Sequence, residues 1–182
     1  MMRLRTGKLI LRLPAALKGA WQCVPAGAGD RAFLQEVFAS TRSIELELLG
    51  PDTALRDAFI QSQMLAQRRS VELHYPAAIE LILRHHGQPA GRLWLHEDHD
   101  GLRVVDITVL PAFQRMGGAS SCLQALLQLA DADVVPIHLH VLRDNPVRHW
   151  YARLGFDITS VSGLYQAMTR IPTIEEHQHE QT

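Results

Sequence analysis

The chain has 182 residues, of which 47% are hydrophobic and 20% charged, and its formal net charge is −1. This length suits one domain with a buried core, and the balance of acidic and basic residues argues against nucleic acid as the main partner, because phosphate binding leaves a basic excess. Two cysteines, Cys23 and Cys122, are too few for a disulfide framework, and no apolar run reaches the roughly 20 residues that span a bilayer. We therefore expect a soluble, reduced, cytoplasmic protein without a membrane or nucleic-acid partner.

The first 18 residues carry five basic side chains around the apolar run Leu9–Leu11. Arg12 and Pro14 interrupt this run, which argues against a signal peptide. The pattern leaves open an added strand, a docking segment or a frayed tail. We divide the chain into an N-terminal extension over residues 1–18, one α/β domain over 19–171 and a polar tail over 172–182.

The pattern after the extension predicts a strand and two helices. Residues 21–24 predict a short strand, and the Pro/Gly run behind them predicts a turn. Asp30 is placed to cap a helix whose apolar residues recur at helical spacing. Gly50-Pro51 breaks the chain, and Asp52 or Thr53 starts a second helix.

The period then changes to that of strands. Residues 78–84, 91–96 and 102–110 predict three strands joined by short turns, which form an antiparallel meander that ends at Pro111. A glycine-bearing loop follows, and behind it a helix with one apolar face. That face holds Ala119, Cys122, Leu123, Leu126, Leu127 and Ala130.

The last third predicts strands around a short helix. Residues 137–142 predict a strand, and Asn145-Pro146 starts a short helix for which Gly155 is the natural stop. Two further strands, around 156–161 and 164–169, complete the domain.

The glycine-bearing loop, residues 109–120 (VLPAFQRMGGAS), is the most informative stretch. It leads from a strand into a helix whose first amides have no internal partner and whose dipole favours anions. Small residues at 117–119 allow a phosphate to approach the backbone, and Arg115 adds a positive charge. The segment alone leaves open a plain turn that needs glycine only for its geometry.

Two motifs together resemble the GCN5-related N-acetyltransferase (GNAT) superfamily. The spacing of Gln114, Gly117 and Ala119, behind Val-x-Pro, resembles the acyl-CoA pyrophosphate loop of that family. The segment 145–156 (NPVRHWYARLGF) resembles its second signature, an Asn followed by a short helix with Tyr and then Leu-Gly-Phe. Both motifs stand in the expected order, and the resemblance covers the chain from about Trp21 to Arg170.

The resemblance implies a three-layer α/β fold, with a mixed, mostly antiparallel sheet of about six to seven strands flanked by about four helices. It also implies acetyl-CoA as acyl donor and no metal. The pantetheine arm would bond to the backbone of the fourth strand, the loop amides would hold the pyrophosphate, and Asn145 would contact the cofactor through its side chain. The implied cofactor-binding residues are Ile107, Thr108, Val109, Gln114, Arg115, Met116, Gly117, Gly118, Ala119, Ser120 and Asn145.

The chain departs from the family pattern at two loop positions. Arg115 stands where relatives commonly have glycine, and Gly118 stands where they have an apolar residue. A glycine in a helix costs up to about 1 kcal/mol relative to alanine. These departures motivate a second hypothesis, a CoA-binding or regulatory module that has lost catalysis.

Tyr151 is the implied acid, because a tyrosine at this position of many relatives protonates the departing thiolate. The alternative is a core tyrosine on the apolar face of its helix. His140 is the first candidate for the base that frees the attacking amine, since its ordinary pKa of about 6.5 suits that role. Asp106 is the second candidate, and its alternatives are an ordinary solvent-side strand position or a buried partner for an arginine. His138 shares the strand face of His140, and the alternative for both is a strand side chain that faces solvent or a packed helix.

The sequence holds ten histidines, and some stand near carboxylates. Residues 96–100 (HEDHD) are dense in possible metal ligands, but they fall on a predicted turn, where polar residues are expected. We expect no functional metal site there, at His138-x-His140 or at His177-x-His179.

The sequence therefore predicts an N-acyltransferase that moves an acetyl group from acetyl-CoA to an amine by direct attack. The acceptor is a small-molecule amine or a peptide, and a protein N-terminus or lysine stays open. The acceptor walls, residues 30–75 and 160–166, hold mixed charges with no readable preference. We expect a monomer or a homodimer.

Overall fold

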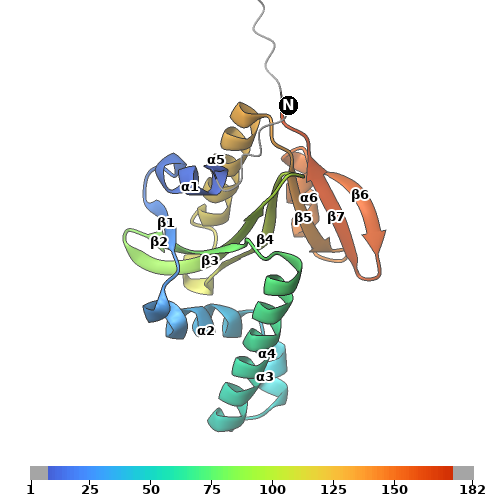
Figure 1. The fold of residues 1–182 in the computed structure, drawn as a ribbon. Coiled ribbons are helices and arrows are strands. Elements are labelled where there is room, and N and C mark those ends of the chain that lie inside the picture. Colours follow the sequence, from blue (N-terminus) through green and yellow to red (C-terminus); the bar gives the residue numbers. More distant parts are fainter. Residues whose placement is uncertain (1–7, 174–182) are drawn as a thin grey trace, which may run out of the picture.

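The computed structural model describes residues 8–173, which form one seven-stranded sheet flanked by helices (Figure 1). The strand order is β1-β2-β3-β4-β5-β7-β6, and every neighbouring pair is antiparallel except β4 and β5. The predicted meander is β2-β3-β4. The strands are β1 (Trp21–Pro25), β2 (Ile79–His85), β3 (Gln88–Glu97), β4 (Leu102–Val109), β5 (Ile137–Leu142), β6 (Asp157–Ser162) and β7 (Tyr165–Arg170).

The described chain has six α-helices and two 3-10 turns, where the resemblance implied about four helices. The α/β fold class and the mixed sheet are confirmed, and α1 and α3 are the additions. The helices are α1 (Lys8–Ala16), α2 (Arg31–Ser40), α3 (Ser43–Leu48), α4 (Thr53–His74), α5 (Gly118–Asp133) and α6 (Val147–Arg153), and the 3-10 turns are η1 (Ala28–Asp30) and η2 (Pro111–Phe113). No helix among residues 8–173 is both long and apolar enough to cross a membrane.

The alternation of side chains along β3 separates the two faces of the sheet. Leu93 and Leu95 point into the main core, where α1 and α5 cover the sheet. Arg92 and Trp94 point to the other face, where they meet side chains of α4. Figure 1 shows α1 and α5 on one side of the sheet and α2 to α4 on the other.

Helix α1 is anchored in the core, although its sequence left its structure open. Leu9 and Leu13 are fully buried, and the helix packs on α5. The backbone amides of Leu9 and Ile10 donate to Glu97 Oε2 at 3.2 and 3.3 Å, so a carboxylate from the end of β3 caps the start of α1. Residues 8–16 are therefore part of the folded domain.

The sheet divides between β4 and β5. These parallel strands pair only from Leu102–Val104 to Ile137–Leu139. Beyond that point residues 106–109 keep β3 as a partner on one edge, while the other edge of residues 105–109 pairs with no strand in the described chain. Peptide groups along this edge are thus free to bind a ligand that enters between the two halves of the sheet.

Candidate active site

The loop between β4 and α5 has an unusual backbone. Arg115 and Gly117 both adopt the left-handed conformation, with φ of 62° and 83°. Glycine reaches this region freely, whereas a residue with a Cβ, such as Arg115, pays a steric cost. The side-chain amide of Gln114 donates to the carbonyl of Val109 at 3.1 Å and closes the loop on the strand it leaves.

The start of α5 offers unpaired donors. Gly117 is the N-cap, and the first backbone bond of the helix runs from the amide of Ser121 to the carbonyl of Gly117 at 2.8 Å. Within the described chain no backbone acceptor is recorded for the amides of residues 118–120. Unpaired amides and the positive end of the helix dipole make this loop suited to a phosphate group.

Gly118 has a steric reason to be glycine. A Cβ at this position would lie 2.6–2.8 Å from three ring carbons of Trp21, closer than atoms can pack. The indole Nε1 of Trp21 also donates to the carbonyl of Met116 at 2.9 Å. Gly118, which replaces the apolar residue of the family pattern, therefore makes room for Trp21 of β1. The sequence around Gly118 gives no sign of this contact.

The three strand residues Ile107, Thr108 and Val109 lie on the part of β4 that no longer pairs with β5. Ile107 and Val109 send their side chains into the main core. Thr108 donates through its hydroxyl to Asp106 Oδ2 at 3.2 Å. Their side chains are thus engaged within the protein, and what they offer a ligand is the unpaired backbone edge of β4.

Tyr151 lies on α6 and is 7% exposed. Its ring packs against Phe156 and Trp150, with centroids 5.8 and 5.3 Å away. Burial raises the pKa of Tyr151 above its ordinary value, and the negative charge of Asp106 raises it further. The phenol therefore stays protonated at neutral pH.

The two histidines of β5 have different partners. His138 binds Thr169 Oγ1 at 2.9 Å through Nδ1 and the carbonyl of Asp100 at 3.1 Å through Nε2, so both ring nitrogens serve the structure. His140 is exposed, and Arg103 donates to its Nδ1 at 3.3 Å. Burial, Arg103 and His138 lower the pKa of His140, which keeps its ring neutral at pH 7.

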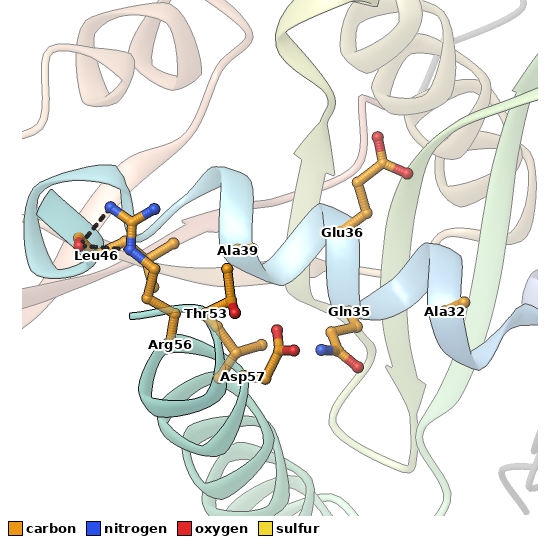
Figure 2. Close-up of a pocket in the computed structure, with 9 residues that line it drawn as sticks. Ala32, Gln35, Glu36, Ala39, Leu46, Thr53, Arg56 and Asp57 are labelled. Carbon is orange, nitrogen blue, oxygen red and sulfur yellow. Dashed lines mark hydrogen bonds between the residues drawn. The ribbon is translucent and has the colours of Figure 1, made fainter. Parts of the chain in front are cut away.

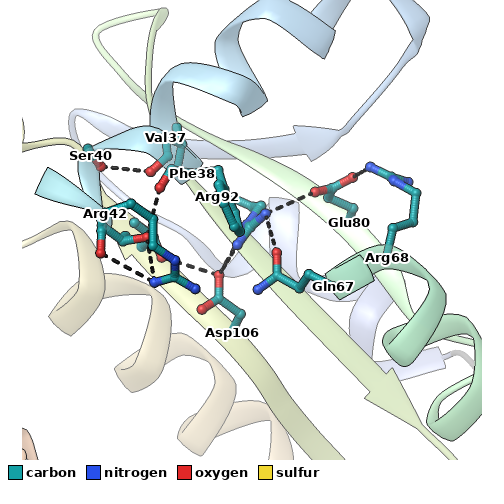
Figure 3. Close-up of polar contacts among 11 residues, drawn as sticks. Val37, Phe38, Ser40, Arg42, Gln67, Arg68, Glu80, Arg92 and Asp106 are labelled. Carbon is teal, nitrogen blue, oxygen red and sulfur yellow. Dashed lines mark hydrogen bonds and ion pairs between the residues drawn. The ribbon is translucent and has the colours of Figure 1, made fainter. Parts of the chain in front are cut away.

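Asp106 belongs to a chain of ion pairs on the α4 side of the sheet (Figure 3). Its Oδ2 accepts from Arg92 Nε at 3.1 Å and Nη2 at 2.7 Å. Arg92 is 3% exposed and also lies 3.8 Å from Glu80, which Arg68 binds at 2.8 Å. Of the two alternatives that the sequence offered for Asp106, a solvent-side strand position and a partner for an arginine, the arginine partner is present. Oδ1 makes no hydrogen bond within the described residues.

Asn145 acts as a local cap. Its Oδ1 accepts from the amide of Val147 at 3.0 Å, and the residue is exposed at the start of α6. The N-cap of α6 is Pro146, so Asn145 stands one residue before the N-cap position that the sequence offered beside cofactor contact, although its side chain does satisfy the first amide of the helix. The exposed side chain remains accessible to a ligand.

The possible metal ligands on the β3–β4 turn are exposed. Single ligand atoms of Asp98, His99 and Asp100 lie within 4.8 Å of one another. The turn itself uses one of them, since Asp98 Oδ1 accepts from the amide of Asp100 at 2.9 Å. His177 and His179 lie outside the described residues.

Two cavities lie between α2 and α4, within the segment expected to wall the acceptor. One of about 510 Å³ is lined by both helices and by Leu46 of α3, and Figure 2 shows two of its lining residues in contact, with Arg56 donating to the carbonyl of Leu46. The other, of about 600 Å³, has Arg31, Arg68 and Glu80 among its lining residues. Neither is lined by a predicted catalytic or cofactor-binding residue, so the stretch where β4 and β5 no longer pair is the better candidate for the chemistry.

Solved structures support the fold. PaiA N-acetyltransferase from Thermoplasma acidophilum, in complex with coenzyme A, is 15% identical and aligns over 84% of this chain and 99% of its own, with a TM-score of 0.59. An acetyltransferase from Thermus thermophilus is 18% identical over 85% and 99%, with a TM-score of 0.59. RimL, a ribosomal α-N-protein acetyltransferase in complex with coenzyme A, is 15% identical over 86% and 96%, with a TM-score of 0.58.

A search of curated protein sequences finds no match. The model of the acetyltransferase (GNAT) family matches residues 46–156, which is more than half of the chain and includes both motifs. The protein is therefore a member of the GNAT family of acetyl-CoA-dependent acetyltransferases.

Proposed function

We propose that this protein transfers an acetyl group from acetyl-CoA to an amine by direct attack of the amine on the thioester. The reaction takes place where β4 and β5 no longer pair, beyond Val104 and Leu139. The observation that supports the proposal most is the combination of an anion-binding loop with an adjoining free strand edge. The unpaired amides at residues 118–120 suit a pyrophosphate, and the free edge at 105–109 suits the amide groups of a pantetheine arm.

The residues that hold acetyl-CoA in this proposal act mainly through their backbone. Amides from Arg115 to Ser120 bind the pyrophosphate, and peptide groups of Ile107 to Val109 bond to the pantetheine arm. Gln114 fixes the loop, and Asn145 contacts the cofactor while it caps α6. Acetyl-CoA supplies the acetyl group as an activated thioester.

In the proposed reaction the amine nitrogen attacks the thioester carbon, so a C–N bond forms, the C–S bond breaks and the amine loses one proton. Tyr151 gives its proton to the departing thiolate and regains one from solvent. Its raised pKa keeps the phenol protonated, as an acid requires.

Tyr151→Phe tests the role of the phenol. The variant keeps the ring packing against Phe156, so it should fold and bind CoA as the wild type does. We expect turnover to fall about 10-fold or more, the usual contribution of a general acid. Thiol release is measured together with CoA titration, and an unchanged rate of thiol release would remove Tyr151 from the mechanism.

Two groups are candidates for the base that takes the amine proton. His140 is neutral, but its Nδ1 lone pair accepts from Arg103, so Arg103 must move before His140 can act. Asp106 is held by Arg92 through Oδ2, which leaves Oδ1 as an acceptor. We propose His140 as the base and Asp106 as the second candidate.

The acceptor is proposed as a small amine or a peptide. The α-N-protein acetyltransferase among the structural neighbours favours testing protein N-termini beside small amines. A thiol-release screen over polyamines, aminoglycosides, lysine peptides and N-terminal peptides would show which class is used.

The second candidate function is a CoA-binding module without catalysis, and the left-handed Arg115 in the loop is the observation that favours it. Thermal-shift titration with acetyl-CoA, followed by the same screen, separates the two functions. Binding without turnover across the whole panel would favour the module, and no binding would exclude both.

A further inference from the structure

Trp21 connects the edge of the sheet to the candidate phosphate loop. It lies on β1, 95 residues before Met116, yet its indole Nε1 donates to the Met116 carbonyl at 2.9 Å. The six-membered ring of the same indole covers Gly118, where it occupies the space that a Cβ would need. One side chain thus contacts the loop both through a hydrogen bond and through packing.

The indole is itself held from several sides. Trp21 is 4% exposed, and His85 of β2 packs on it with ring centroids 4.8 Å apart. His85 in turn lies 6.0 Å from Phe113 of η2, which opens the loop. The indole ring is therefore buried between β1, β2 and the loop, and its neighbours on these elements hold its position.

The hydrogen bond from Trp21 is made at the part of the loop whose backbone conformation is unfavourable. Met116 stands between Arg115 and Gly117, the two residues with left-handed backbone. A left-handed Arg115 is unfavourable by itself, so contacts elsewhere must hold it. The hydrogen bond from Trp21 to the Met116 carbonyl joins a side chain from another part of the sheet to the backbone between Arg115 and Gly117.

We propose that Trp21 is a positioning residue for the pyrophosphate of CoA, acting through the loop and touching no ligand. This inference rests on the proposed function, because it takes the amides of residues 118–120 as the pyrophosphate site. Trp21 sets the loop conformation in which these amides converge, and Gly118 is the residue that makes room for it.

Trp21→Phe tests the hydrogen bond, since it removes the N–H donor and keeps an aromatic ring. We expect CoA affinity to fall about three- to ten-fold, which corresponds to the loss of one hydrogen bond. The KM for acetyl-CoA should rise by about the same factor, while kcat and the acceptor KM stay near their wild-type values. Trp94→Phe is the matched control: Trp94 is equally buried, at 4%, but contacts Arg68 and Arg92 on the other face, so CoA affinity should not change.

A double-mutant cycle with Gly118→Ala tests the packing. In the wild-type background the new Cβ meets the indole, so both melting temperature and CoA affinity should fall. In a Trp21→Leu background the space is open and alanine favours the helix, so the same change should be neutral or stabilising. This reversal of sign does not depend on the hydrogen bond.

The outcomes separate this inference from the function on which it rests. If the wild type binds CoA and Trp21→Phe binds it equally well, the role of Trp21 is only structural and the inference is wrong. Equal effects of Gly118→Ala in both backgrounds would also overturn it. A wild type that binds no CoA would overturn the proposed function and the inference together.

Discussion

Single side chains of β4 and β5 show how neighbouring groups select a role for a titratable residue. Both ring nitrogens of His138 form hydrogen bonds, one with Thr169 and one with Asp100, whereas the ring of His140 has one hydrogen-bond partner, Arg103. The sequence placed both histidines on one strand face, and that placement holds because Ile137, Leu139 and Val141, which alternate with them along β5, are buried in the core. The sequence could not show that Arg103 donates to Nδ1 of His140, because this contact depends on how β4 and β5, which are distant in sequence, lie side by side.

The pH dependence of turnover tests the proposed base. Burial, Arg103 and His138 lower the pKa of His140 below its usual value of about 6.5, and the ring accepts a proton only while it is neutral. After correction for the neutral fraction of the acceptor amine, which also falls with pH, we expect kcat/KM of the wild type to stay level down to about pH 6.5 and to fall below it, where the ring protonates. His140→Gln should lower kcat/KM about 10- to 100-fold and remove this acidic limb.

The result against His140 is an acidic limb that persists in His140→Gln at near wild-type rates. Asp106→Asn is then the informative variant, because Oδ1 of Asp106 is the second acceptor proposed. Since Asn keeps an oxygen for Arg92 and Thr108, the variant should fold, and its thermal melting checks this directly.

At the scale of elements, helices with a local signal were predictable and those without one were not. Helix α4 begins at Thr53 with Asp52 as its cap, as the break at Gly50-Pro51 indicated. Helix α3 (SIELEL) alternates apolar and acidic residues, which is the period of a strand and not of a helix, and it buries none of its residues. Helix α1 contains Pro14 and takes its cap from Glu97, which lies far away in sequence, so local patterns could not reveal it.

Glu97 gives α1 a dependence on pH. Burial raises the pKa of this carboxyl, and the bonds from Ile10 and Leu9 oppose the shift only in part. A group with a raised pKa in the folded state stabilises the protein fully below its unfolded pKa of about 4.3 and loses this contribution as pH rises through the folded pKa. Glu97→Gln keeps an acceptor for the amides but does not titrate.

We therefore expect the free energy of unfolding of the wild type, relative to Glu97→Gln, to decrease as the pH rises from about 4 to 7. Urea unfolding followed by circular dichroism measures both proteins across this range. Glu47→Gln, on the exposed surface of α3, is the surface control. Parallel curves for wild type and Glu97→Gln would contradict the expectation.

At the scale of the whole molecule, the order of elements was accessible from sequence and the point where β4 and β5 stop pairing was not. The meander, the glycine loop and the Asn145 helix have local signatures, and each forms at the expected place. The separation of the strands beyond Val104, and the contact between Trp21 and Gly118, arise only when distant segments pack together. The loop motif pointed to the ligand, but the folded sheet supplies the free strand edge that completes the candidate site.

The central claim is that CoA binds between this loop and the open edge of β4. Titration of ¹⁵N-labelled protein with CoA, followed by amide chemical shifts, tests it directly. We expect the largest shifts at Arg115–Ser120 and Ile107–Val109, with little change at the cavities between α2 and α4. No shifts on addition of CoA, or shifts confined to α2 and α4, would contradict the account.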